Sequence, residues 1–385
     1  DNVFSNCSSL INIILPDSIK TIGDNAFAGC SSLDYVKLSQ SITAIGNNAF
    51  AGCTSLEIIT IPTSVNVLGT EIFKDCSNLK KVRLPFLGKT ISDEKNNFLG
   101  FIFGASKSSE NSKYVPASLK EVAITNGITI GQDAFYNCTS IEKIELADTI
   151  ITLGNSAFTQ CINLKEVIFG ENSQLVNIND SAFQGCTSLE SIVIPNTVTS
   201  IGKKAFKNCT SLKKIEIPNT IKSIGSEAFN LCIILKSVIF EENSQLTSIG
   251  SSVFANCNSL NSIAIPNGIT SIPDYLFYNC TNLKEIVIPN TVTIISPFAF
   301  NGCEKLERLT IPFVGKTLNG TENTHFGYIF GASSCVKNND FVPASLKEVI
   351  ITGGSLIDEY AFYKCENIEF VKIAKTITIL RHQAF

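Results

Sequence analysis

The sequence contains only two histidines in 385 residues, and this scarcity limits the chemistry that the chain can perform. A Ser/His or Cys/His catalytic pair needs a histidine beside the nucleophile, and a zinc site needs histidine or closely paired cysteine ligands. Neither His325 nor His382 stands in such a context, and no C-x-x-C pair occurs. We therefore expect no catalytic residue, no metal, no cofactor and no small-molecule substrate, so the chain is predicted not to be an enzyme.

An excess of basic residues and long apolar runs are also lacking. Thirty Lys and Arg residues against 34 Asp and Glu residues give a net charge of -4, which does not favour binding to nucleic acid or to an anionic membrane surface. No apolar run approaches the length of a membrane span, and no signal peptide is visible. The chain begins and ends inside a repeat, so we expect a fragment of a longer array, with membrane association only through segments outside it.

A Gly-Lys-Thr triplet, the end of a nucleotide-binding phosphate loop, occurs twice, at 88–90 and 315–317. The first glycine of such a loop lies five positions earlier, where this chain has Arg83 and Thr310. Without that glycine the backbone N–H groups cannot wrap the phosphates ahead of a helix. The pattern thus excludes a nucleotide site and indicates that Gly88 and Gly315 serve backbone turns.

The dominant feature is a repeat. Thirteen of the fourteen cysteines follow a phenylalanine by three residues, and successive cysteines of this series are 23 residues apart in eight of twelve intervals. Two further intervals are 25 residues long and carry the letters ENSQL, and two are much longer, from Cys76 to Cys138 and from Cys303 to Cys365. Self-similarity at such a period indicates a solenoid in which each coil contacts only its neighbours.

The coil at residues 186–209, CTSLESIVIPNTVTSIGKKAFKNC, is representative. Leu189, Ile192 and Ile194 follow the pattern L-x-x-L-x-L of a short strand that points its apolar residues into the core, and proline closes the strand. Phe206 and Cys209 are predicted to eclipse in a 3-10 turn. The residue before the cysteine is Gly, Asn or Asp in ten of thirteen coils, which predicts a left-handed corner there. Fifteen such strands would form one long parallel sheet on the concave side.

The unit LxxIxIPxxVxxIGxxAFxxC resembles the surface leucine-rich repeats called BspA-like or Treponema-type, over essentially the whole chain. The resemblance implies a β-rich, right-handed leucine-rich-repeat solenoid, here a single one over residues 1–385. It also implies a secreted or cell-surface protein of host-associated bacteria or some parasitic protists, without catalysis. The partner would be a protein, such as a host matrix or cell-surface protein. The alternative is a scaffold or spacer that presents glycan-binding or hydrolytic domains outside this sequence.

The cysteine ladder admits two interpretations. Buried thiols can act as small apolar core residues, which we favour because side chains stacked in register point parallel rather than at each other. Disulfides between adjacent coils are the alternative, since the spacing of stacked strands lies in the range of disulfide Cα separations. Cys335 stands outside the ladder in a polar stretch, and its counterpart in the other long interval is Ser108.

The outward positions of the strands suggest a contact surface. The fifth position of the L-x-x-L-x-L pattern is mostly apolar between residues 168 and 287, and contiguous exposed apolar surface is where partners bind. The alternative is that β-branched residues simply suit strands. The candidate protein-contact face comprises Glu166, Ile168, Val193, Lys214, Glu216, Ile239, Ala264, Glu285 and Val287.

The two long intervals align with each other from end to end without a gap, so the sequence contains two equivalent enlarged coils, at 85–118 and 312–345. Their extra residues predict a short amphipathic helix that ends at a glycine and packs its aromatic side on the flank of the solenoid. We therefore expect Phe101 and Tyr328 to be buried. The two coils either grip a long ligand or record a duplicated structural block, and duplication is the usual way in which arrays grow.

Overall fold

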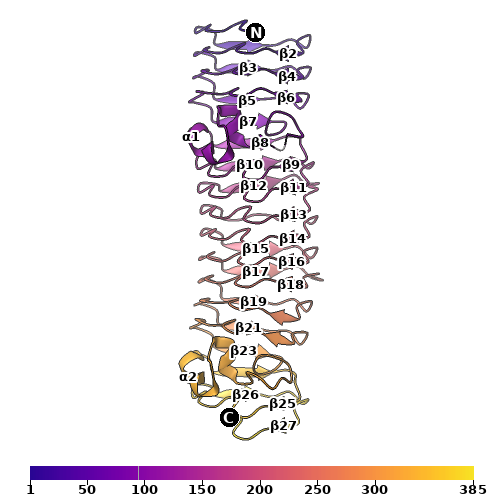
Figure 1. Cartoon of the computed structure of the whole chain (residues 1–385), viewed down its shortest axis with the longest axis vertical. Helices are drawn as coiled ribbons and strands as arrows, with labels where there is room; N and C mark the ends of the chain where they lie inside the picture. Colours follow the sequence, from indigo (N-terminus) through magenta and orange to yellow (C-terminus); the bar gives the residue numbers. More distant parts are fainter. Residues whose placement is uncertain (94) are drawn as a thin grey trace. The chain divides into compact units, whose positions relative to one another are not determined.

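The computed structural model describes residues 1–93 and 95–385. The chain forms two compact units, Asp1–Thr197 and Val198–Phe385, which share one kind of coil and are described separately. Each regular coil places one strand in a parallel sheet and, after a bend, two residues in a second parallel ladder (Figure 1). The predicted fold class, a parallel leucine-rich-repeat solenoid, is confirmed.

In unit 1 the parallel pairs of the main sheet join equivalent residues of successive coils, such as Asn12 with Tyr35. The main-sheet strands are β1 (Asn12–Ile14), β3 (Tyr35–Lys37), β5 (Ile58–Thr60), β7 (Lys81–Leu84), β8 (Glu121–Ile124), β10 (Lys143–Leu146) and β12 (Glu166–Phe169). The second ladder contains β2 (Thr21–Ile22), β4 (Ala44–Ile45), β6 (Val67–Leu68), β9 (Thr129–Ile130), β11 (Thr152–Leu153) and β13 (Asn177–Ile178).

Unit 2 repeats this arrangement. Its main-sheet strands are β15 (Lys214–Ile217), β17 (Ser237–Phe240), β19 (Ser262–Ala264), β21 (Glu285–Val287), β23 (Arg308–Ile311), β24 (Glu348–Ile351) and β26 (Phe370–Lys372). Its second ladder contains β14 (Ser200–Ile201), β16 (Ser223–Ile224), β18 (Ser248–Ile249), β20 (Ser271–Ile272), β22 (Ile294–Ile295), β25 (Leu356–Ile357) and β27 (Ile379–Leu380). Fourteen of the fifteen expected main-sheet strands therefore form. Residues 191–194 lie in neither ladder.

The core of each coil follows from the alternation of side chains along a strand. In β10, Ile144 and Leu146 are buried while Lys143 and Glu145 are partly exposed. The phenylalanines stack on the same residue of the next coil, with ring centroids 5.2 Å apart for Phe27 and Phe50. Such offset stacking adds attraction beyond the buried area, and it requires the coils to stay in register.

The corner before the cysteine is left-handed in all thirteen coils of the series, as the frequent Gly, Asn and Asp residues predict. Gln160, Leu231 and Lys364 adopt the same positive φ although their residue types do not favour it. A second left-handed position lies five residues before the cysteine, for example at Asn25 and Tyr275, and the sequence analysis did not anticipate it. The segment is a pair of tight turns in place of the expected 3-10 turn.

All fourteen cysteines are free, and eleven of them are buried. The ladder thiols donate to the carbonyl of the phenylalanine one coil away, as in the 3.0 Å bond from Cys161 Sγ to Phe135 O. The same carbonyl accepts the N–H of Cys138 at 3.0 Å, so the thiol occupies its second lone pair. Burial raises the pKa of Cys161 to about 12. The interpretation of the ladder as buried thiols is confirmed.

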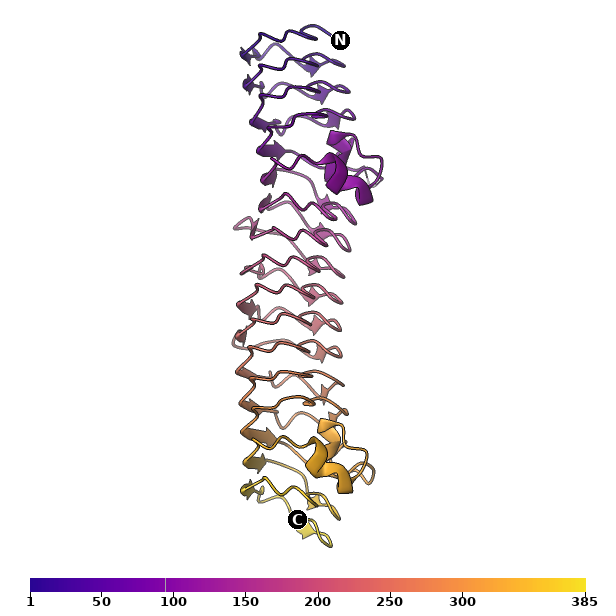
Figure 2. The ribbon, with the colours of Figure 1, turned by 90° about the vertical axis from the view of Figure 1, so that its left-hand side faces the viewer.

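The enlarged coils carry the only helical segments of the described residues (Figure 2). In unit 1 they are η1 (Leu99–Phe103), η2 (Ser108–Glu110) and α1 (Asn111–Tyr114), and in unit 2 they are η3 (Phe326–Phe330), η4 (Cys335–Lys337) and α2 (Asn338–Phe341). Each first helix ends at a left-handed glycine, Gly104 or Gly331 with φ of 103°. Gly88 and Gly315 also have positive φ, so their predicted role in backbone turns is confirmed.

The enlarged coil does more than cover the flank of the solenoid. Its first helix takes the place of the tight turn that precedes the cysteine in an ordinary coil, and so it continues the column of stacked turns. Phe73 N–H donates to Ile102 O at 2.9 Å. In an ordinary coil the acceptor is the carbonyl of the residue before the next phenylalanine, as in the bond from Phe27 N–H to Ala49 O. The Phe103 ring then follows Phe73 in the aromatic ladder, at 6.3 Å. Phe101 is buried as predicted, whereas Tyr328 is only half-buried, so the prediction is wrong for the tyrosine.

One buried asparagine holds each enlarged coil closed. Asn111 Oδ1 accepts the N–H of Gly100 at 2.8 Å, and its Nδ2 donates to the carbonyls of Ala134 and Tyr136 in the next coil. Asn338 makes the corresponding bonds to Gly327, Ala361 and Tyr363. Both amides are fully buried. A polar side chain at such a depth is stable only with these partners.

The burial of the thiols predicts their reactivity. When native protein is treated with a thiol reagent at neutral pH, the exposed thiol of Cys7 and the half-buried thiol of Cys335 should react quickly. The Cys365 thiol should react slowly, because burial raises its pKa to about 12. The other eleven should react only after unfolding in urea. A double variant, Cys7→Ser with Cys335→Ser, should abolish the fast phase. Fewer than fourteen thiols in urea would reveal disulfides and contradict the assignment.

The substitution Asn111→Ala should lower the unfolding free energy of unit 1 by about 2 to 3 kcal/mol, because buried backbone groups lose their partners. Urea titration followed by circular dichroism measures the change. The adjacent Ser112 is exposed, so Ser112→Ala is the matched control and should leave the midpoint unchanged. Equal behaviour of the two variants would show that the amide is dispensable.

Candidate protein-contact surface

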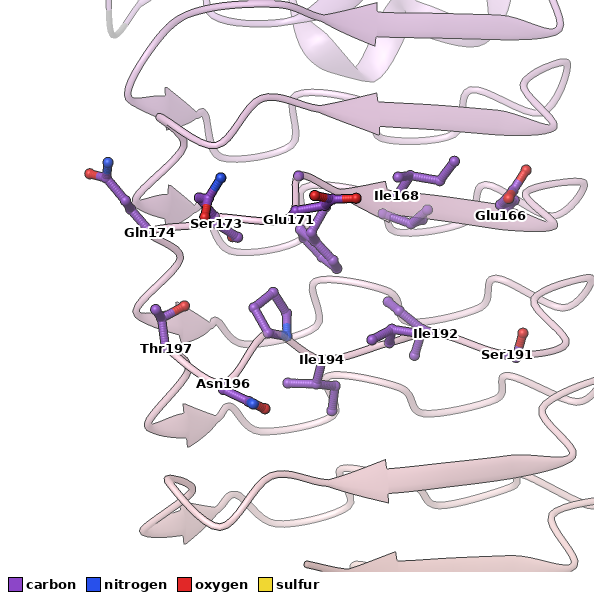
Figure 3. Close-up of a pocket in the computed structure, with 16 residues that line it drawn as sticks. Glu166, Ile168, Glu171, Ser173, Gln174, Ser191, Ile192, Ile194, Asn196 and Thr197 are labelled. Carbon is purple, nitrogen blue, oxygen red and sulfur yellow. The ribbon is translucent and has the colours of Figure 1, made fainter.

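A groove of about 810 Å³ opens on the sheet face of unit 1, between β12 and residues 191–194 (Figure 3). Glu166 and Ile168 lie on its β12 side, and Ser191 and Val193 on the other. Val193 is 83% exposed and Ile168 37%, whereas Ile192 and Ile194 beside Val193 point into the core. The groove therefore has an apolar centre that is open to solvent and a polar rim.

The groove exists because the sheet is interrupted there. β12 is the last strand of its sheet, and the next coil runs past it without joining the ladder. The coil of β12 has two extra residues directly after the strand, in the letters GENSQL. They form a longer turn in which Ser173 N–H donates to Gly170 O at 3.1 Å and the Ser173 hydroxyl accepts Leu175 N–H. This turn lines the groove opposite residues 195–197 and separates the two coils.

The second 25-residue coil has the same feature. In unit 2 the letters ENSQL follow β17, and the main sheet is again interrupted between β17 and β19. Ser244 makes the corresponding turn, accepting Leu246 N–H at 3.3 Å, and a groove of about 370 Å³ lies between the strands. A third groove of about 500 Å³ lies between β3 and β5 in unit 1, where the sheet is interrupted without an insertion.

All nine residues of the candidate contact face point to solvent. The structure brings three of them, Glu166, Ile168 and Val193, together in the groove beside β12. Ala264 lines the groove of unit 2. The remaining five lie on β15, β17 and β21 of the unit 2 sheet, namely Lys214, Glu216, Ile239, Glu285 and Val287.

The sheet face of unit 1 is also crossed by ion pairs between adjacent strands. Lys81 Nζ lies 2.6 Å from Glu121 Oε2, and this hydrogen bond lowers the pKa of Glu121. Lys143 reaches Glu166 at 3.1 Å, and the bond raises the pKa of Lys143. The charges on β7, β8 and β10 thus pair with one another, and the series ends at Glu166 on the rim of the groove.

The expectation that the fifth position faces solvent is wrong at Thr310, which is 9% exposed, and at Ala123, which is 2% exposed. Ala123 lies in register between Arg83 on β7 and Glu145 on β10. Those two side chains join above it, with 3.0 Å between Arg83 Nη1 and Glu145 Oε2. A small residue between two long, oppositely charged ones is therefore covered, although its strand position points outward.

The two histidines lie in different surroundings, His325 in the interior of the enlarged coil and His382 at the surface. His325 is buried, with Nδ1 3.1 Å from Asn338 Oδ1. Within residues 1–93 and 95–385 no group of three or more His, Cys, Asp or Glu side chains could hold a metal ion. The sequence analysis missed the contact between His325 and Asn338, because only the folding of the two helices between them brings these residues together.

These features define a class of protein, the leucine-rich-repeat solenoid. Within that class the chain belongs to the BspA type leucine rich repeat region family, whose model matches residues 1–98, 108–221, 199–327 and 334–385 in six copies. No helix in the described part of the chain is long and apolar enough to cross a membrane.

Solved structures with similarity to the chain include three bacterial proteins. A leucine-rich repeat protein from Bacteroides ovatus is 25% identical over 69% of this chain and 82% of its own, with a TM-score of 0.37. A leucine rich cell surface protein from Faecalibacterium prausnitzii is 25% identical over 84% and 83%, with a TM-score of 0.35. The leucine rich repeat protein of T. pallidum is 27% identical over 48% and 77%, with a TM-score of 0.37. No curated protein matches the chain.

The pair above Ala123 should contribute little to stability despite its good geometry. In a double-mutant cycle of Arg83→Ala and Glu145→Ala, we expect a coupling free energy of about 0.2 to 1 kcal/mol, because both side chains are about one-third exposed. Raising the salt from about 0.05 to 0.5 M should reduce the coupling through screening. Urea titrations give the values. A coupling well above about 1 kcal/mol that does not respond to salt would contradict this account.

Proposed function

We propose that this chain is a non-enzymatic protein-binding module, secreted or displayed at a cell surface, that mediates adhesion. The observation that carries the proposal is the groove beside β12, where Ile168 and Val193 expose apolar side chains at the centre of a polar sheet face. An apolar centre inside a polar rim is the usual anatomy of a protein interface. The nine-residue contact face is the surface that we assign to the partner.

The chemistry of the groove suggests what the partner offers. The exposed side chains of Ile168 and Val193 suit an apolar anchor residue of the partner. Binding energy concentrates where such a residue fills a desolvated pocket. Glu171 lies on the rim and suits a Lys or Arg beside the anchor. The partner that we propose is therefore an extracellular protein, such as a host matrix protein, with an exposed apolar residue next to a basic one.

The absence of enzymatic activity is part of the proposal and has three supports. Burial raises the pKa of ladder thiols such as Cys232 to about 12, which keeps them protonated and unreactive. His325 makes its hydrogen bond to a neutral amide, Asn338, and not to a nucleophile or a carboxylate. The BspA type family to which the chain belongs is typically non-enzymatic.

The proposal is tested with Val193→Glu. Val193 is mostly exposed, so the substitution should leave folding unchanged while it places a charge at the apolar centre of the groove. The wild-type chain is first tested for binding to immobilised collagen, laminin and fibronectin. For the protein that it binds, we expect Val193→Glu to weaken the affinity about tenfold or more. Surface plasmon resonance measures the affinity. Ile128→Glu is the matched control, because Ile128 is 55% exposed outside the main sheet.

Equal loss with both variants would argue against the groove as the contact site. Binding of the wild-type chain to none of the three proteins would favour the second function, a scaffold that presents other domains. The continuous core of each unit and the paired charges of the unit 1 sheet are compatible with that role.

A further inference from the structure

The enlarged coils are equivalent in fold but differ at one buried position. Phe98 precedes η1 in unit 1, and His325 precedes η3 in unit 2, at the equivalent position of the aligned coils. The side chains are 5% and 7% exposed. Each packs edge-on against the ring three residues later, with centroids 6.3 Å apart for Phe98 and Phe101 and 6.2 Å for His325 and Tyr328. A titratable ring thus occupies a site built for an apolar one.

The hydrogen bonds around Asn338 determine which nitrogen of His325 carries the proton. Asn338 Nδ2 donates to the carbonyls of Ala361 and Tyr363, so its Oδ1 must be the acceptor that faces the imidazole. His325 Nδ1, 3.1 Å away, is therefore protonated and donates. Nε2 carries the lone pair of a neutral imidazole, and it is buried with no protein partner in the described part of the chain.

Among the described residues, His325 has a hydrogen bond to the neutral Asn338 and no ion pair. Titratable or charged groups of this coil and the next one include Tyr328, Lys337, Asp340, Asp358, Tyr360, Tyr363, Cys365, Arg381 and His382. Lys337 pairs with Asp340 at 3.4 Å on the exposed side of η4 and α2, and Asp358 pairs with Arg381 at 3.0 Å. Each carboxylate therefore already has its base. Burial lowers the pKa of His325, and the bond to Asn338 only partly offsets it.

We propose that His325 makes the enlarged coil of unit 2 an acid-sensitive latch. When neutral, its ring joins the apolar packing and donates to the asparagine that closes the coil. When Nε2 binds a proton, the ring becomes a cation in an apolar site without a partner. The segment from η3 to α2 then detaches from the coil, which exposes the charged ring to water. The enlarged coil of unit 1, with Phe98, does not respond to acid in this way.

The direction of the effect follows from linkage. His325 has a lower pKa in the folded coil than the value of 6.5 of a free imidazole, so the opened coil binds protons more readily. The stability of the closed coil is therefore constant above about pH 6.5 and falls as the pH drops below this value. The equilibrium constant for opening rises by up to about tenfold for each pH unit. The loss ends once the pH is below the pKa of the closed coil.

Hydrogen exchange followed by mass spectrometry on the full chain tests the latch. Peptides covering η1 to α1 and η3 to α2 are compared in the same sample, so that the pH dependence of intrinsic exchange cancels in their ratio. Between about pH 7.5 and 5.5 the unit 2 block should lose protection relative to the unit 1 block by up to about tenfold. A ratio that stays constant over this range would overturn the proposal.

The two coils also provide matched variants. His325→Phe should make the ratio independent of pH. Phe98→His combined with His325→Phe should transfer the acid sensitivity to unit 1, because Asn111 there already accepts the N–H of Gly100 as Asn338 accepts that of Gly327. A merely structural role for His325 would change the protection of unit 2 equally at every pH. Persistent acid sensitivity of unit 2 in His325→Phe would likewise refute the latch.

Discussion

Stacking in register is the constraint on which every other feature of this protein depends. A single coil cannot bury its own leucine, phenylalanine and cysteine side chains, so each is stable only against the same residue one coil away. The 5.2 Å stack of Phe27 on Phe50 and the bonds between thiols and carbonyls are two expressions of this condition. Any segment that disturbs the spacing of the coils must therefore appear at the surface, where it changes the site.

The groove beside β12 is such a disturbance. Two additional residues lengthen one turn, the sheet loses a strand pairing, and two side chains that would otherwise lie in a continuous strand surface border an opening. The groove in which we propose that the partner binds is thus produced by an irregularity in the repeat and not by the repeat itself. The enlarged coils show the opposite solution, because the added residues rebuild the missing turn and keep the register from β7 to β8 intact.

Most of the fold could be predicted from the sequence because it depends on local patterns that recur. The phenylalanine and cysteine spacing, the proline after the strand and the frequent Gly or Asn before the cysteine each have one simple structural meaning. Positive φ at Leu231 could not be predicted from residue type, since the neighbouring coils impose it. The sheet face was anticipated, but its grooves were not, because the letters ENSQL do not reveal that a longer turn displaces the next strand. The burial of His325 likewise depends on Asn338, which lies beyond two helices in the chain.

The enlarged coils have a consequence for how such a chain can vary. The strands β7 and β8 pair residue for residue, Lys81 with Glu121 and Leu84 with Ile124, although an enlarged coil rather than an ordinary one lies between the partners. The pairing of β7 with β8 therefore tolerates the added chain between them, because the enlarged coil supplies its own aromatic ring and backbone bonds to the stack of turns. A coil with these properties is an acceptor site, in which a loop of different sequence can be grafted while the rest of the array is unchanged.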